Sequence, residues 1–497
     1  MPSIIVVMST LPELLYAPAQ VRELDRRAIE EQGIPGYSLM TRAGTFAYRL
    51  IRDRWGSRKL VVVCGAGNNA GDGYVIARLA LADGISAEVI FLVEPDRLKG
   101  DAARAAADYG EAGGRWRPFD GDLPDNALIV DALLGTGLDR PVSGQFADAV
   151  EAINRNTGPV MAVDVPSGLN AETGAVMGAA VRADVTATFV GMKSGLLTGR
   201  GPDLCGHVIY DSLGVPATVF DGVPVKARRI TDSELRSHLE PRPRDAHKGI
   251  SGHVLIVGGG EGMPGAARLA GEAALRAGAG LVSVATRPEH VAAVVAGRPE
   301  LMCRGLTDSR DLAPMVERAT TIAVGPGLGQ TDWSREMFEA VMSTDRTLVV
   351  DADGLNLLAS KPSARGNWIL TPHPGEAARL LGQDTRAVQD DRFAAAAALV
   401  EEYDAVAVLK GAGSLVADPG GETGLCTAGN PGMAVAGMGD VLTGVIGALV
   451  AQGLATAEAA RLGVLIHARA GDEASRVGER GMMASDLFPW IRHHANP

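Results

Sequence analysis

Aromatic side chains are scarce in this sequence. Phe, Trp and Tyr make up only 4% of the 497 residues, although hydrophobic residues make up 46%. The interior must therefore consist mainly of Ala, Val, Leu and Ile, a composition that suits parallel sheets buried under helices. A chain of this length is too long for one ordinary core, so we expect two or three domains.

Positive charge is also in short supply. The 47 Lys and Arg residues are outnumbered by 59 Asp and Glu residues, which gives a formal net charge of −12. This balance argues against a general nucleic-acid-binding surface, because such surfaces neutralise many phosphates with basic side chains. Any anionic ligand must instead be bound locally, by loops and helix ends.

Cysteines are few, and long apolar runs are missing. The apolar run at residues 4–8 is too short for a signal peptide or a membrane span, and no later run is long enough, so we expect no membrane association. The cysteines are widely scattered and no pair has metal-binding spacing, which indicates reduced thiols in a cytoplasmic protein. They are Cys64, Cys205, Cys303 and Cys426.

A glycine-rich stretch at residues 429–440 is the most distinctive feature of the chain. It reads Gly-Asn-Pro-Gly-Met-Ala-Val-Ala-Gly-Met-Gly-Asp and is followed by an apolar helical run. This pattern predicts a loop that leads into a helix N-terminus, where unpaired amides and the helix dipole favour anions. Asp440 could cap that helix. It could also accept a proton from a hydroxyl that attacks a phosphate bound by the same amides.

The first half contains a second glycine-rich stretch. Helical periodicity from residue 18 to 55, broken at residues 33–36, precedes a buried strand at residues 60–64. The strand leads into Gly-Ala-Gly-Asn-Asn-Ala-Gly-Asp-Gly at residues 65–73, and a helix is predicted over residues 74–81. Strand, glycine loop and helix form the phosphate-binding layout of a Rossmann-type unit. A tight turn alone does not require the three polar side chains, two Asn and one Asp, that this stretch contains.

Two further predicted strands of the first half end in polar residues. Asp131 ends one strand and is followed by a Gly-Thr-Gly loop, and Asp164 and Ser167 follow the next. In open α/β sheets ligands collect outside the carboxyl ends of strands. Asn69, Asp131 and Ser167 could therefore supply oxygens to one hard cation. Each of Asp131 and Ser167 alone would more simply cap a turn, but the three together favour a site.

These motifs resemble the NAD(P)HX epimerase family, the N-terminal half of bifunctional nicotinamide-nucleotide-repair proteins, over about residues 18–220. The resemblance implies a potassium ion on Asn69, Asp131 and Ser167, and Asp164 as a catalytic residue. Ala70 departs from the family, which usually has Gly there, and Lys193 is interpreted as an edge feature rather than a catalyst. The hydrated dinucleotide would be held by Asn68, Asn69, Ala70, Gly71, Asp72, Gly135, Thr136, Gly137, Leu138, Asp139, Arg140, Pro141 and Asp164.

The second half begins a new parallel sheet near His253, after a proline-containing connection. A helix is predicted from residue 264, with proline at its favoured first position. Several strands then end in loops, and His373 lies between two prolines in Thr-Pro-His-Pro-Gly-Glu. A histidine held in this way at a strand end is more often placed for a ligand than for structure alone.

This half resembles the ADP-dependent NAD(P)H-hydrate dehydratases, a branch of the ribokinase-like superfamily, over about residues 228–495. The motifs are Gly-Pro-Gly-Leu-Gly, Asp-Ala-Asp-Gly-Leu-Asn, Thr-Pro-His-Pro-Gly-Glu, Leu-Lys-Gly-Ala-Gly and Gly-Met-Gly-Asp. No β-lid insertion is expected between Gly252 and Gly280. The resemblance implies that Ala267, Gly327, His373 and Asp440 face the hydrated substrate, with Asp440 catalytic. It implies that the nucleotide contacts Lys410, Gly411, Ala412, Gly413, Ser414 and Gly439.

The predicted fold is α/β, with two three-layer αβα domains. Residues 1–222 would form a Rossmann-like epimerase domain and residues 223–497 a ribokinase-like dehydratase domain without a β-lid. The first would interconvert the R and S hydrates of NADH or NADPH. The second would dehydrate the S epimer with ADP, giving AMP and phosphate. The sequence alone does not distinguish ADP from ATP.

We expect K⁺ at the first site, ADP as co-substrate with Mg²⁺, and a cytoplasmic homo-oligomer that binds small molecules and no nucleic acid. Two alternatives stay open at this point. The second half could be a small-molecule kinase that phosphorylates a vitamin-like alcohol. The first half could be a non-catalytic binding module, although a scaffold would not need the intact Asn-Asn and Asp.

Overall fold

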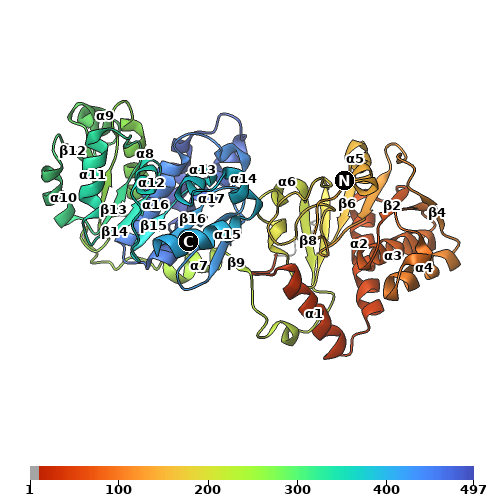
Figure 1. Ribbon diagram of the computed structural model, residues 1–497. Helices are drawn as coiled ribbons and strands as arrows, with labels where there is room; N and C mark the ends of the chain where they lie inside the picture. Colours follow the sequence, from red (N-terminus) through yellow and green to blue (C-terminus); the bar gives the residue numbers. More distant parts are fainter. Residues whose placement is uncertain (1–10) are drawn as a thin grey trace. The chain divides into compact units, whose positions relative to one another are not determined.

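The computed structural model describes residues 11–497, and the chain divides after Ala227 into two compact units (Figure 1). The sequence placed the domain boundary between residues 222 and 223. The apolar run at residues 4–8 lies outside the described residues. Within the described part of the chain, no helix is long and apolar enough to cross a membrane.

The first unit is built on a parallel sheet with the strand order β4-β3-β2-β5-β6-β7-β8. The central strands are fully buried, as expected for a sheet with helices on both faces. The strands are β2 (Leu60–Cys64), β3 (Ala87–Phe91), β4 (Arg115–Pro118), β5 (Leu128–Ala132), β6 (Val160–Val163), β7 (Val185–Phe189) and β8 (His207–Asp211); a short β1 (Leu14–Leu15) precedes them.

Helices cover both faces of this sheet. Apolar residues of the first four helices form one core layer, and those of α5 form the core on the other face. The helices are α1 (Pro18–Glu30), α2 (Gly36–Trp55), α3 (Asn68–Ala82), α4 (Gly100–Glu111), α5 (Gln145–Arg155) and α6 (Gly201–Leu204).

Helix α3 begins earlier than the sequence predicted. Residues 68–73 belong to the helix, so the prediction of a loop up to residue 73 is wrong. The glycines there provide room for packing. A Cβ atom on Gly71 would lie 2.5 Å from Met40 Cε, and one on Gly73 would lie 2.7 Å from Ala132 Cβ. Asn69 is thereby held in the first turn of a closely packed helix.

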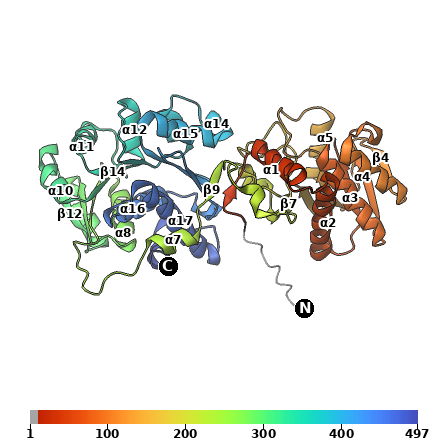
Figure 2. The same cartoon turned by 90° about the horizontal axis from the view of Figure 1, so that it is seen from below.

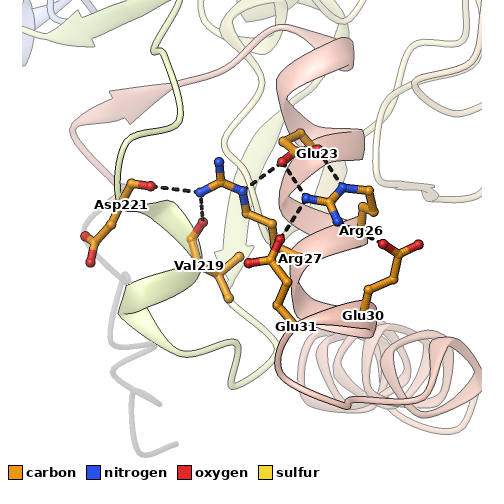
Figure 3. Close-up of polar contacts among 7 residues, drawn as sticks. All are labelled: Glu23, Arg26, Arg27, Glu30, Glu31, Val219 and Asp221. Atoms are coloured by element: carbon orange, nitrogen blue, oxygen red, sulfur yellow. Dashed lines mark hydrogen bonds and ion pairs between the residues drawn. The ribbon is translucent and has the colours of Figure 1, made fainter.

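Helix α1 is fastened to the segment that precedes the second unit (Figure 3). The side chain of Arg27 donates to the carbonyl oxygens of Asp221 at 2.8 Å and Val219 at 3.4 Å. Beside it, Arg26 pairs with Glu23, Glu30 and Glu31. Exposed pairs of this kind contribute little to stability. The bonds to the main chain matter more here, because they fix the position of α1.

The second unit is built on a larger sheet with the order β9-β18-β17-β16-β15-β14-β13-β10-β11-β12. Its strands pair in parallel except β17, which is antiparallel to both neighbours. They are β9 (Ala227–Arg229), β10 (His253–Val257), β11 (Leu281–Thr286), β12 (Met302–Gly305), β13 (Thr321–Val324), β14 (Thr347–Val350), β15 (Trp368–Leu370), β16 (Val406–Leu409), β17 (Ser414–Ala417) and β18 (Thr423–Cys426).

Two groups of helices enclose this sheet, and Figure 2 shows α8, α16 and α17 on one side with α11, α12 and α15 on the other. Between Gly252 and Gly280 the chain forms only β10 and α8, so no β-lid is present there. The helices are α7 (Asp232–His238), α8 (Pro264–Arg276), α9 (Val291–Gly297), α10 (Ala313–Arg318), α11 (Asp332–Met342), α12 (Asp353–Ser360), α13 (Pro374–Leu380), α14 (Thr385–Asp390), α15 (Arg392–Tyr403), α16 (Met438–Ala451), α17 (Thr456–Ala474) and α18 (Phe488–His494).

Small residues bring α16 very close to its neighbours. A Cβ atom on Gly444 would lie 2.0 Å from the carbonyl oxygen of Ala270 in α8. On the other side, a Cβ atom on Gly463 of α17 would lie 2.6 Å from Ile446. Since real Cβ atoms do not approach so closely, α16 has its present position only because both glycines lack side chains. The layered α/β fold predicted from the composition is confirmed.

Candidate active sites

The carboxyl ends of β5 and β6 meet in the first unit, as the sequence predicts. The backbone N–H of Ser167 donates to Asp131 Oδ2 at 2.8 Å, and its hydroxyl donates to Asp131 Oδ1 at 2.6 Å. The Ser167 hydroxyl oxygen in turn accepts from the backbone N–H of Leu134 at 2.9 Å. Burial raises the pKa of Asp131 to about 6, although the bonds from Ser167 act against this shift. Asp131 and Ser167 therefore stabilise the turn as well as presenting oxygens.

Asn69 is buried beside this pair of strand ends, with its side chain unused. Neither its amide nitrogen nor its carbonyl oxygen has a hydrogen-bond partner among the described residues. A Cβ atom on Gly135 would lie 3.4 Å from Asn69 Cβ and 3.8 Å from Asp164 Oδ2, so the loop after β5 lies between these side chains. A buried carboxamide without a partner is costly. An oxygen ligand set of this type fits a hard cation.

Asp164 forms an ion pair with a lysine that sequence reasoning set aside. Lys193 Nζ lies 2.5 Å from Asp164 Oδ1 and also donates to the hydroxyl of Thr188 and the carbonyl oxygen of Phe189. Only 1% of the Lys193 surface is exposed, so its interpretation as an edge feature is wrong. Twenty-nine residues separate the partners, and no local pattern connects them.

Backbone strain accompanies the Asp164–Lys193 pair. Asp164 has a φ of 69° and Val190, which precedes Lys193 by three residues, has a φ of 57°. This left-handed region is disfavoured for side chains with a Cβ atom and most of all for a β-branched residue. Such conformations persist where the surrounding structure holds a functional geometry in place.

Two further carboxyl groups interact with this pair. Burial is the main cause that raises the pKa of Asp72 well above its ordinary value, and the negative charge of Asp164 adds to this shift. Burial also raises the pKa of Asp25 on α1 to about 6, where Lys193 opposes and Asp164 adds to the shift. No sequence pattern points to Asp25, because its helix packs here only in the folded unit. Burial thus favours the protonated form of both Asp25 and Asp72 beside the Asp164–Lys193 pair.

The remaining predicted residues of this site surround the central groups. Ala70 and Gly71 are buried in the first turn of α3. Leu138 is half-buried, while Asn68 and most of the loop after Thr136 are open to solvent. The exposed positions are Asn68, Gly137, Asp139, Arg140 and Pro141.

In the second unit, Asp440 lies in the first turn of α16. The N-cap of this helix is Gly437, with a φ of 91°, so the alternative that Asp440 is only a helix cap is wrong. Burial is the main cause that raises the pKa of Asp440 to about 7, and the negative charge of Asp351 adds to this shift. The positive charge of Lys410 acts in the opposite direction. The carboxyl group of Asp440 therefore lies at the same end of α16 as the unpaired first N–H groups of this helix.

Lys410 brings a positive charge to the same region. Its ammonium lies 2.8 Å from Asp351 Oδ1 and 3.7 Å from Glu376 Oε2. Burial alone would lower the pKa of Lys410, but these negative charges raise it above the ordinary value. A Cβ atom on Gly439 would lie 3.3 Å from Lys410 Nζ, so a side chain at this position would press on the ammonium. Lys410, Gly439 and Asp440 thus form one cluster at the start of α16.

The segment after Lys410 is a tight glycine turn. The Ser414 hydroxyl donates to the carbonyl oxygen of Gly411 at 3.0 Å and accepts from its N–H at 3.2 Å. Gly411 and Ala412 are exposed, and Gly413 and Ser414 are half-buried. A turn with this exposure, next to an ammonium, can approach a polyphosphate closely.

His373 caps α13 and is fixed by the helix it begins. Its Nδ1 accepts from the N–H groups of Gly375 at 2.9 Å and Glu376 at 3.3 Å. The Nε2 atom consequently carries the proton and lies 3.5 Å from Glu376 Oε1. The side chain is 57% exposed, so its outer face can still meet a ligand.

Ala267 lies in α8, and Gly327 packs against the start of that helix. Ala267 is completely buried in the first turns of α8. Gly327 has a φ of 55°, and a Cβ atom on it would lie 2.9 Å from the carbonyl oxygen of Met263. Only glycine fits this contact without strain.

Comparison with known families identifies both halves. The family model described as NAD(P)H-hydrate dehydratase matches residues 254–492, and the one described as YjeF-related protein N-terminus matches residues 36–195. The chain is 48% identical to the bifunctional NAD(P)H-hydrate repair enzyme of Coxiella burnetii, covering 97% of this chain and all of the relative. It is 44% identical to the enzyme of the same name from Escherichia coli, covering 98% and 95%.

A solved structure resembles the second unit. It is the ADP/ATP-dependent NAD(P)H-hydrate dehydratase of Bacillus subtilis co-crystallised with ATP and Mg²⁺, with 30% identity and a TM-score of 0.50 over 54% of this chain and 96% of that chain. Each of the two α/β units has a charged cluster near its strand ends, and the matching relatives are enzymes, so the chain is an enzyme built from two α/β units. The chain belongs to the family of bifunctional NAD(P)H-hydrate repair enzymes, as its motifs predicted.

Proposed function

We propose that the first unit interconverts the R and S hydrates of NADH and NADPH, and that the second dehydrates the S epimer with ADP, giving AMP and phosphate. The observation that carries the dehydratase assignment is the cluster of Asp440 and Lys410 at the start of α16. The alternatives of a vitamin-like kinase and a non-catalytic first unit are disfavoured by the full-length relatives.

In the dehydratase reaction the oxygen of the ring hydroxyl attacks the terminal phosphorus of ADP, and Asp440 accepts the proton of that hydroxyl. The bond from that phosphorus to the bridging oxygen breaks and AMP leaves. The carbon–oxygen bond of the new phosphate ester then breaks, driven by the ring nitrogen lone pair, and phosphate leaves. Loss of a proton from the neighbouring carbon restores the dihydropyridine. Phosphoryl transfer needs mainly positioning and charge stabilisation, which the α16 amides and Lys410 supply.

Nucleotide contacts are proposed for the residues that the sequence predicts, Lys410 to Ser414 and Gly439. The ATP and Mg²⁺ named for the Bacillus subtilis structure support a nucleotide with Mg²⁺ at this site. A magnesium ion would be bound mainly by phosphate oxygens and water. We propose ADP as the co-substrate and His373, Gly327 and Ala267 as the substrate-facing positions.

In the epimerase unit, Asp164 and Lys193 form the proposed catalytic pair. Epimerisation requires the carbon–oxygen bond at the hydrated carbon to break and to re-form on the other face of the ring. A carboxylate and an ammonium in contact provide a proton acceptor and a proton donor for that oxygen. The proposed dinucleotide contacts are Asn68 to Asp72 on α3 and Gly135 to Pro141 in the loop after β5. A cytoplasmic homo-oligomer remains part of the proposal.

The whole proposal predicts a simple separation of activities. Purified protein should equilibrate the two hydrates without nucleotide, and added ADP with Mg²⁺ should restore the absorbance of the reduced ring and release phosphate. A fragment ending at Ala227 should retain only the first activity, since that unit has its own sheet and core. The measurement is absorbance together with chromatography of the epimers. A stable phosphorylated alcohol without recovered absorbance would instead identify a kinase.

The proposed potassium site predicts a dependence of epimerisation alone on the cation. Asn69→Ala should raise the K⁺ concentration needed for half-maximal epimerisation about tenfold or more, corresponding to about 1.4 kcal/mol or more of lost binding. Fold stability should not fall, because the Asn69 side chain has no hydrogen-bond partner among the described residues to lose. Asp131→Ala should slow epimerisation further and leave dehydration unchanged.

The measurement is the epimerase rate against K⁺ concentration, with choline replacing K⁺ at constant ionic strength. Asn68→Ala, at the exposed position next to Asn69, is the matched control: its half-maximal K⁺ concentration should stay unchanged, although its rate should fall if Asn68 contacts the dinucleotide. Equal epimerase rates with and without K⁺ in the unmodified protein would refute the cation site.

A further inference from the structure

Asp351, the first residue of the Asp-Ala-Asp-Gly-Leu-Asn motif, is a buried carboxylate to which the proposed mechanism gives no role. It follows β14 directly and is only 1% exposed. Its N–H donates to the carbonyl oxygen of Val324 at 3.1 Å, and the next residue, Ala352, has a φ of 48°. A left-handed alanine is disfavoured, so the surrounding structure holds this turn in place. Asp351 therefore has a fixed position at the strand end.

Each oxygen of Asp351 contacts a different element of the candidate site. Oδ1 accepts from Lys410 Nζ at 2.8 Å, and Oδ2 accepts from the Thr443 hydroxyl at 2.9 Å. Thr443 lies on α16 three residues after Asp440. Burial alone would raise the pKa of Asp351, but the Lys410 charge and the hydrogen bonds keep it below its ordinary value. Asp351 is thus an anion that joins Lys410 to α16.

The position of Lys410 matters because a third carboxyl group is nearby. Within the described residues, the ion pairs of Lys410 go to Asp351 and Glu376, while Asp440 interacts with it only at longer range. If the ammonium paired directly with Asp440, it would occupy the oxygen that must accept the hydroxyl proton. It would also withdraw positive charge from the phosphate site.

We propose that Asp351 is a positioning residue of the dehydration reaction, which holds the Lys410 ammonium away from Asp440 and directs it toward the phosphate. This inference rests on the proposed role of Asp440 as the base. The charged groups that act on Asp440 from the surrounding elements are Asp351, Lys410, Asp353 and Glu376.

Asp351→Asn keeps the size of the side chain and removes its charge. The dehydration rate should fall about 10-fold to 100-fold, less than the loss of about 10²–10⁴-fold typical for removing a general base. The acid limb of the plot of kcat/KM for dehydration against pH should move below its position near pH 7. The reason is that Asp440 loses the nearby negative charge of Asp351, and the Lys410 ammonium moves closer to it. Epimerisation by the full chain should stay unchanged.

Two variants separate this role from a purely structural one. Thr443→Val removes the hydroxyl but keeps the Asp351 charge, so it should leave the acid limb in place. In the unmodified protein, Lys410→Met should lower the dehydration rate by a certain factor. Added to Asp351→Asn, the same change should lower the rate by a smaller factor, because it removes an ammonium that is already misplaced. The acid limb reports the Asp440 environment independently of how much protein is folded.

The proposal is overturned if Asp351→Asn lowers only the rate or the melting temperature while the acid limb remains at the same pH. Full activity of Asp351→Asn would also overturn it. A separate result, full activity of Asp440→Asn, would refute Asp440 as the base and thus identify failure of the proposed mechanism itself.

Discussion

The Asp440→Asn protein should fold, bind nucleotide and epimerise normally, yet lose dehydration by about 10²–10⁴-fold, the usual cost of removing a general base. Asparagine keeps the shape of the side chain, and the N-cap of α16 is Gly437, so the helix does not depend on this carboxylate. Nucleotide affinity should be unchanged or slightly higher, because a negative charge next to the phosphates is gone. The measurement is phosphate release at saturating ADP with epimer exchange in parallel.

The pH dependence provides an independent check of the Asp440 role. Because the pKa of Asp440 is raised to about 7, kcat/KM for dehydration should rise as the pH increases through 7, when the base form appears. Its ordinary value is 3.8, so the folded state binds the proton more tightly than the unfolded state. Stability from this group is therefore lost as the pH rises from about 4 to about 7. Asp440→Asn should lose less stability over that range, as measured by thermal unfolding. Loss of both activities together would instead indicate misfolding.

Asp164→Asn and Lys193→Met should each abolish epimerisation, by about 10²–10⁴-fold, while ADP-dependent dehydration of the S hydrate continues. Asp164 accepts from the buried ammonium at 2.5 Å, so replacing either residue removes the ion-pair partner of the other. The two single variants and the double variant should therefore show nearly the same residual rate. The measurement is the rate of exchange between the separated epimers.

A second lysine–carboxylate pair in the same unit provides a matched control for the Lys193 variant. Lys226 lies 2.6 Å from Glu172, and both side chains of this pair are more exposed than those of the Asp164–Lys193 pair. Lys226→Met should keep the epimerase rate within about twofold, since surface pairs contribute little. Equal losses in Lys193→Met and Lys226→Met would contradict a specific role for the Asp164–Lys193 pair.

The sequence predicted the strands and the residues at their ends because both are local patterns. The apolar runs of β2, β5 and β6 are short. Asp164 directly follows β6, Asp131 is the second-last residue of β5, and Asn69 comes shortly after β2. Parallel pairing then placed Asp131 next to Ser167 without further information. The sequence indicated that the glycines at residues 65–73 matter, but it did not indicate why they are needed. Gly71 and Gly73 allow close packing inside α3, which a sequence cannot distinguish from a loop.

Partners distant in sequence could not be predicted. Lys193 contacts Asp164 from a turn after β7 in which Val190 has a positive φ, and backbone strain of this kind has no sequence pattern of its own. Asp351 and Lys410 follow strands β14 and β16, and β15 lies between these two strands in the sheet. Their contact depends on the strand order and on the length of one side chain. His373 was correctly placed at a strand end, yet its capping of α13 appears only in the structure.

The close contacts of α16 restrict how this protein can change over time. With Gly444 against α8 and Gly463 of α17 against Ile446, the helix has no space to slide or tilt when a neighbouring residue grows. Mutations that add even one methyl group along these contacts should be eliminated by selection, whereas the exposed turn at Gly411 and Ala412 can vary. New nucleotide or substrate preferences should therefore arise by exchanging loops around an unchanged helix. A core poor in aromatic side chains makes this division possible, because small residues allow the short distances that hold Asp440 in place.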